Sequence, residues 1–99
     1  MAKTMIQFSD LVDINGSEKQ IAWANKIRSE AITSIRSSLL GMQRQVQVGK
    51  VSEASANKRV EALLTVLNRH MEASWWIDNR QNYDDLIANE WHDEMSKES

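Results

Sequence analysis

The sequence contains no cysteine and no proline, and its only glycines are Gly16, Gly41 and Gly49. The lack of cysteine excludes disulfide bridges, thiolate metal sites and cysteine nucleophiles. So little proline and glycine leaves few points at which a helix must stop, which favours long helices over many short strands. No run approaches the roughly 20 apolar residues of a membrane span, and residues 1–7 lack the apolar core of a signal peptide. We therefore expect a soluble, cytoplasmic protein.

Length and composition favour one small folded domain over residues 1–99. The chain is 41% hydrophobic and 26% charged, which is close to the globular average and unlike a disordered chain. A chain this short is expected to bury only roughly 60–65% of the surface that its unfolded form exposes. Dimerisation would bury more apolar surface, so a homodimer is expected.

The clearest helix signal begins at Ser17. Ser17 and Gln20 match a capping box, in which each side chain accepts a hydrogen bond from the main chain of the other. A helix over 18–40 follows, and Gly41 is the predicted stop. At about 100° per residue its apolar residues share one face: Ile21, Ala24, Ile27, Ala31, Ile32, Ile35 and Leu39.

Two further helices are expected downstream. Ser52 and Glu53 begin the second, whose apolar face holds Ala56, Val60, Leu63, Leu64, Leu67 and Met71, and whose pattern runs on through Trp75 and Ile77. Asn82 begins a shorter third helix. Residues 1–16 are predicted to form an extended arm, 41–51 a loop and 96–99 a disordered tail. The fold class is therefore all-α: two long helices in a hairpin, a shorter third helix and an N-terminal arm.

Arg28 lies near the middle of the apolar face of the first helix, beside Ala24 and Ile35. An unpaired buried guanidinium is costly, so it needs an acceptor. Asp78 follows the apolar cluster Trp75-Trp76-Ile77, and we predict a structural Arg28–Asp78 ion pair. The functional alternative is that Arg28 receives an external phosphate or carboxylate.

Charge is unevenly distributed: residues 17–70 carry nine basic and four acidic residues, whereas 71–99 carry two basic and eight acidic. The acidic third helix either folds back on the basic helices, remains solvated, or offers a negative surface to a partner. Adjacent Trp75 and Trp76 cannot point in the same direction from one helix. Either both pack, or one is exposed, as at interface hot spots.

The first functional hypothesis is a non-enzymatic interaction module that binds a protein with a basic surface. Its predicted partner-binding residues combine exposed tryptophan with acidic side chains: Trp76, Trp91, Asp84, Asp85, Glu90, Asp93 and Glu94. The alternative is a small dimeric nucleic-acid-binding protein. That protein would use the basic residues of the first two helices: Lys19, Lys26, Arg36, Arg44, Lys58 and Arg59. Overall charge of −2 and scattered basic positions make the alternative weaker.

Catalytic and metal signals are lacking. The chain has no nucleophile elbow, no phosphate-binding glycine loop and no H-E-x-x-H pair. Glu90 and Glu94 are spaced as metal ligands would be, but His92 points away from them on a helix. We expect no enzyme, no metal and no cofactor.

Two blocks carry a resemblance: residues 16–24 (Gly-Ser-Glu-Lys-Gln-Ile-Ala-Trp-Ala) with Ile27-Arg28, and residues 73–80 (Ala-Ser-Trp-Trp-Ile-Asp-Asn-Arg). They resemble small uncharacterised proteins of bacteria, phages and mobile elements with G-S/T-x-K-Q-x-x-W-A-x-x-I-R and a downstream W-I-D segment. The resemblance implies that Arg28 and Asp78 belong to a shared pattern. It also implies a phage or mobile-element setting, in which such proteins often bind and inhibit a host protein, including defence nucleases.

Overall fold

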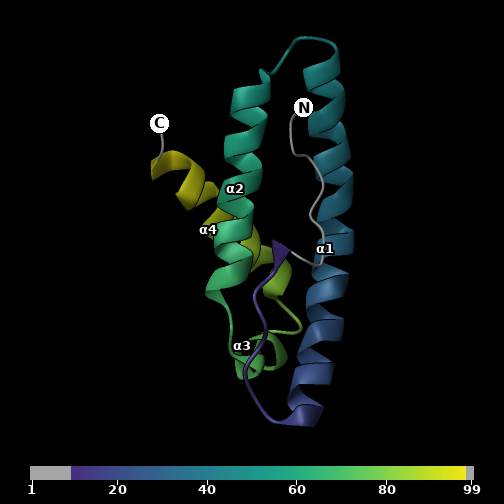
Figure 1. The fold of residues 1–99 in the computed structure, drawn as a ribbon, viewed down its shortest axis with the longest axis vertical. Helices are drawn as coiled ribbons and strands as arrows, with labels where there is room; N and C mark the ends of the chain where they lie inside the picture. The colour runs from purple at the N-terminus through teal and green to yellow at the C-terminus, as the bar shows by residue number, and fades with distance from the viewer. Residues whose placement is uncertain (1–9, 98–99) are drawn as a thin grey trace.

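The computed structural model describes residues 10–97, in which four α-helices account for the regular secondary structure (Figure 1). They are α1 (Glu18–Gln47), α2 (Glu53–Arg69), α3 (Ala73–Asp78) and α4 (Tyr83–Lys97). The long helices α1 and α2 form an antiparallel hairpin, α3 packs on α1, and α4 packs on α2. The all-α prediction is confirmed. No helix within these residues is both long and apolar enough to span a membrane.

Helix α1 begins where the sequence predicts and ends later. The Ser17–Gln20 capping box is present, with both reciprocal hydrogen bonds formed. The predicted stop at Gly41 is wrong, because α1 continues to Gln47 and absorbs most of the expected 41–51 loop. Glycine costs a helix about 1 kcal/mol, but Met42, one residue later, is buried in the core. The left-handed turn falls instead at Gly49, with φ of +80°.

Helix α2 is capped by Ser52, whose side chain accepts from the Ser55 N–H, as the sequence predicts. It ends at Arg69 rather than running through Ile77, so α3 is a separate helix. At the break between α2 and α3, the N-terminal arm pairs with the main chain. The Asn15 N–H donates to Met71 O at 2.7 Å, and the Ala73 N–H donates to Asn15 O at 2.8 Å. A contact distant in sequence therefore divides the apolar pattern into two helices.

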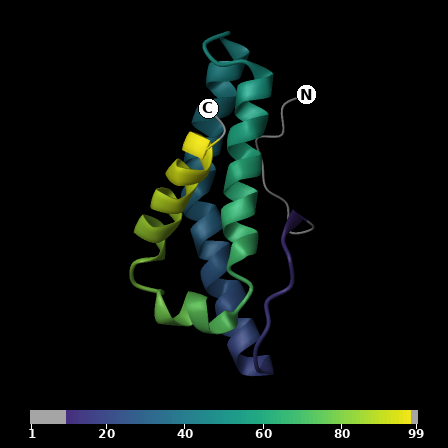
Figure 2. The same cartoon turned by 90° about the vertical axis from the view of Figure 1, so that its left-hand side faces the viewer.

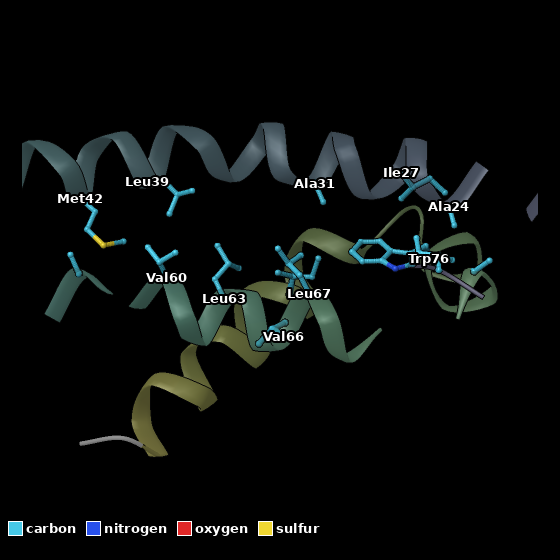
Figure 3. Packing of buried hydrophobic residues seen from close by; sticks show 14 residues of the cluster. Ala24, Ile27, Ala31, Leu39, Met42, Val60, Leu63, Val66, Leu67 and Trp76 are labelled. Carbon is cyan, nitrogen blue, oxygen red and sulfur yellow. The ribbon is translucent and has the colours of Figure 1, made fainter. Parts of the chain in front are cut away.

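The core lies between α1 and α2 and is closed at one end by Trp76 (Figure 3). Leu39 and Met42 of α1 face Val60 and Leu63 of α2. Helix α2 has a second buried face, which includes Ala62 and Val66 and packs against α4. Helix α2 thus packs against α1 with one face and against α4 with another.

Residues 10–16 lie outside the helices and run along the hairpin as an arm, on the side opposite α4 (Figure 2). The arm prediction is confirmed for this stretch, and residues 1–9 lie outside the described part of the chain. The tail prediction is wrong for residues 96 and 97. Both are helical, because α4 continues to Lys97 and the Ser96 hydroxyl donates to His92 O. Residues 98–99 are not described.

Candidate functional site

A surface groove of about 580 Å³ lies where the end of α1, the start of α2 and the end of α4 converge. α1 contributes one residue, because it extends past Gly41. Helices α2 and α4 contribute the others from turns that face each other. The lining residues are Met42, Ser55, Lys58, Arg59, Trp91, His92, Met95 and Ser96.

The floor of the groove is apolar and adaptable. Met42 is 7% exposed, and Trp91 and Met95 are half-buried. The indole N–H of Trp91 donates to Arg59 O at 2.8 Å, which fixes the orientation of the ring. Methionine is flexible and polarizable and suits surfaces that accept varied partners. The groove therefore pairs one fixed aromatic side chain with two adjustable ones.

The ionisable side chains that line the groove are all basic: Lys58, Arg59 and His92. Lys58 and His92 are exposed, and Arg59 is half-buried. The structure thus brings together Trp91, predicted to bind a protein, and Lys58 and Arg59, predicted to bind nucleic acid. Sequence reasoning missed Met42, because it ended the first helix at residue 40. It also missed Met95, although that residue lies one turn after Trp91.

Trp76 is not an exposed partner-binding residue, and that prediction is wrong. Its side chain is 0% exposed, and its indole N–H donates to His70 O at 2.9 Å. Trp75 is half-buried and stacks on His70 with ring centroids 3.6 Å apart. Both tryptophans pack, because α3 lies across the end of the hairpin and directs Trp76 inward.

The predicted acidic surface is divided by the packing of α4 on α2. Asp84, Asp85 and Asp93 are exposed. Glu90 and Glu94 instead accept hydrogen bonds from Arg69, at 2.8 Å for Glu90, and are half-buried. Glu90 also lies 2.9 Å from His70 Nε2, and Lys97 lies 3.3 Å from Glu94. Two of the five acidic residues thus connect α4 to Arg69 and His70 at the end of α2, so their carboxylates are not available to a partner.

The Arg69–Glu94 hydrogen bond leads us to expect a stability that depends on pH. This bond lowers the pKa of the Glu94 carboxyl, and Lys97 contributes in the same direction. A carboxyl with a lowered pKa in the folded state stabilises the protein above its unfolded pKa of about 4.3 and loses this contribution as pH falls. We expect Arg69→Gln to reduce the difference in unfolding free energy between pH 7 and pH 3, measured by urea denaturation.

The matched control for this experiment is Lys19→Gln, which removes the same charge from an exposed position on α1. It should leave that difference unchanged, because Lys19 makes no ion pair within residues 10–97. Equal pH dependence in the Arg69→Gln and wild-type proteins would show that the bond contributes nothing.

Arg28 is buried, 3% exposed, as the sequence predicts, but the predicted ion pair with Asp78 is wrong. Nη1 of Arg28 donates to Val12 O at 2.8 Å, and Nη2 donates to Asn25 Oδ1 at 3.1 Å. Asp78 is exposed at the end of α3. Burial lowers the pKa of Arg28, and the negative charge of Asp13 opposes this effect. The N-terminal arm, through Val12 O, supplies the acceptor that Asp78 was predicted to supply.

The remaining basic candidates do not join the groove lining. Lys19, Lys26, Arg36 and Arg44 are exposed along α1. Within residues 10–97 no group of three or more histidine, aspartate or glutamate side chains is arranged to hold a metal ion.

Comparison with protein-family models, with curated proteins and with solved structures found no match. The resemblance to phage and mobile-element proteins therefore stays a prediction, and the site is interpreted from its own chemistry.

Proposed function

We propose that this chain is a non-enzymatic protein-interaction module whose groove takes an acidic segment of a partner protein, anchored by an apolar side chain. One observation carries the proposal: a half-buried tryptophan and two methionines form the floor of a groove whose ionisable lining residues are all basic. Tryptophan, methionine and arginine are enriched in protein interfaces. An apolar anchor would fill the floor, and flanking carboxylates would meet Lys58 and Arg59.

The sign of charge in this proposal differs from that of the first sequence hypothesis, which expected a basic partner. Glu90 and Glu94 are already bonded to Arg69, so the acidic surface retains only Asp84, Asp85 and Asp93 of its five members. The groove combines a cavity, an oriented aromatic ring and two basic residues, Lys58 and Arg59, that form no ion pair within residues 10–97. Binding and inhibition of a host protein in a phage or mobile-element setting remains the proposed biological context.

Single-stranded nucleic acid is the second candidate, because Trp91 with Lys58 and Arg59 is an aromatic and basic combination. Base stacking needs an open ring face, whereas Trp91 is half-buried and packs in an apolar floor. Dense positive charge also drives such binding, and this chain carries −2 overall. The apolar floor therefore favours a protein segment.

A pair of labelled peptides tests the proposal. Each carries a central Leu-Phe core, flanked in one by glutamates and in the other by lysines. We expect the glutamate peptide to bind, with affinity that falls as salt rises, and the lysine peptide to fail. Trp91→Ala should weaken binding by about 30-fold, equivalent to a hot-spot loss of about 2 kcal/mol. Fluorescence anisotropy measures both effects.

Trp23→Ala is the matched control, because Trp23 is also a tryptophan on the surface but lies outside the groove. It should leave the affinity unchanged, and circular dichroism should show that both variants keep their helices. Equal binding of the two peptides, or tighter binding of a single-stranded oligonucleotide, would contradict the proposal.

A further inference from the structure

Two helices form the walls of the groove, and each presents one face to it. Helix α2 contributes Ser55, Lys58 and Arg59, which are three and four residues apart. Helix α4 contributes the apolar pair Trp91 and Met95, which are four residues apart. Residues at these spacings lie on the same side of a helix. An occupant of the groove therefore lies between two helical faces.

The main chain of these walls offers an occupant no hydrogen-bond donor. Each lining residue lies inside a helix, where its N–H is bonded within that helix. The N–H of Ser55, in the first turn of α2, donates to Ser52 Oγ at 3.1 Å. Arg59 O already accepts from the indole N–H of Trp91. An extended segment in the groove would meet side chains but no N–H group with which to pair.

The N-terminal arm shows what an extended segment of this chain requires. It pairs where α2 has ended and α3 begins. There the Asn15 N–H donates to Met71 O at 2.7 Å, and the Ala73 N–H donates to Asn15 O at 2.8 Å. Recognition of extended peptides by strand addition depends on such main-chain bonds. Helices α2 and α4 continue without a break through the lining residues of the groove, so they offer no equivalent position.

A helical occupant does not need these bonds, because its main chain is bonded internally and it presents only side chains. Along α4, Trp91 and Met95 are separated by about 6 Å, since each residue advances a helix by about 1.5 Å. Apolar side chains four residues apart on a partner helix beside α4 would have the same separation. The groove therefore matches the apolar stripe of an amphipathic helix.

The charge of the walls selects the flanks of this helix. Lys58 and Arg59 lie on the α2 wall and form no ion pair within residues 10–97. No carboxylate is among the residues that line the groove. Carboxylates beside the apolar stripe would be attracted to the α2 wall, whereas lysines there would meet charges of the same sign.

We infer that the groove takes an amphipathic helix of a partner protein, with apolar residues four apart against Trp91 and Met95 and with carboxylates facing α2. This inference rests on the proposed function and adds the conformation of the bound segment. The lining of α4 extends over residues 91–96, so about two turns of the partner helix make contact.

Three labelled peptides of identical composition test the inference, each with one leucine, one phenylalanine, glutamates and alanines. The first places leucine and phenylalanine four residues apart. The second places them two apart, which puts them on one side of a strand but on different sides of a helix. The third keeps the four-residue spacing but has D-alanine between them, which disfavours a right-handed helix at unchanged charge. We expect the first to bind about tenfold more tightly than either of the others in fluorescence anisotropy.

Met95→Gln supplies a test on the protein side. It removes one of the two apolar contacts and should lower the affinity for the first peptide by about tenfold. Met71→Gln is the matched control, because Met71 is 44% exposed but lies outside the groove. It should leave the affinity unchanged.

The outcomes separate this inference from the proposed function. Equal binding of the first and third peptides, or tighter binding of the second, would overturn the helical occupant. The proposed function would survive either result, since it requires only an acidic segment with an apolar anchor. Failure of all three peptides to bind would contradict both.

Discussion

Replacing Trp76 by alanine should lower the free energy of unfolding by about 3–5 kcal/mol, as expected for the loss of a buried tryptophan. Trp76 is fully buried at the end of the hairpin core, where α3 packs on α1. Its ring meets Trp75 edge to face at 4.9 Å between centroids, and Tyr83 lies 6.5 Å away. The substitution would open a cavity among three structural elements. Urea denaturation followed by far-ultraviolet circular dichroism measures the loss.

Trp76→Phe separates packing from hydrogen bonding. Phenylalanine retains much of the volume but leaves His70 O, which accepts from the indole N–H, without its donor. An unpaired buried acceptor costs about 1–3 kcal/mol. The free energy of unfolding of Trp76→Phe should therefore lie between those of Trp76→Ala and the wild-type protein. Trp23→Ala is the control, because Trp23 is 47% exposed and the Arg80 guanidinium lies over the face of its ring. Equal destabilisation by Trp23→Ala and Trp76→Ala would contradict the assignment of the core.

Arg28→Met should cost about 1.5–3 kcal/mol, the contribution of a hydrogen bond to a charged group. Methionine retains the apolar stem but leaves Val12 O without the donor from Arg28. The arm should detach more readily, and the main-chain amide of Val12, which donates to Asn68, should exchange its hydrogen faster. Urea denaturation and hydrogen exchange measure the two effects.

Asp78→Asn distinguishes this arrangement from an Arg28–Asp78 ion pair. Asp78 is exposed, and Arg28 bonds to Val12 and Asn25. The variant should therefore change stability by less than about 0.5 kcal/mol, and its effect should add to that of Arg28→Met. A coupling energy above about 1 kcal/mol between the two substitutions would contradict this arrangement and support the ion pair.

The local elements of this fold follow from the sequence. Ser17 with Gln20 and Ser52 determine where α1 and α2 begin, because capping depends on side chains three residues apart. Apolar spacing placed Ala24, Ala31, Val60, Leu63 and Leu67 in the core, and burial of all five is confirmed. The same spacing placed Arg28 on the buried face. Each of these features needs only the period of a helix and its own neighbours.

Contacts between distant segments decided the rest. The arm, through Asn15, ended α2 at Arg69 and made α3 a separate helix, which the continuous apolar pattern of 56–77 concealed. Helix α1 continues past Gly41 because Met42 is buried, and packing against α2 outweighs the intrinsic cost of one glycine in a helix. Both outcomes depend on segments that are far apart in the chain.

The candidate site was likewise predictable from the sequence only in part. The sequence supplied Trp91, Lys58 and Arg59 as candidates, but assigned them to different functions. The packing of α4 on α2 brought them into one groove and bonded Glu90 and Glu94 to Arg69. The sequence by itself determined where α1 and α2 begin, their apolar faces and the burial of Arg28. The tertiary structure decided which acceptor Arg28 meets and which side chains share a surface, because ion pairs and grooves depend on the distances between helices.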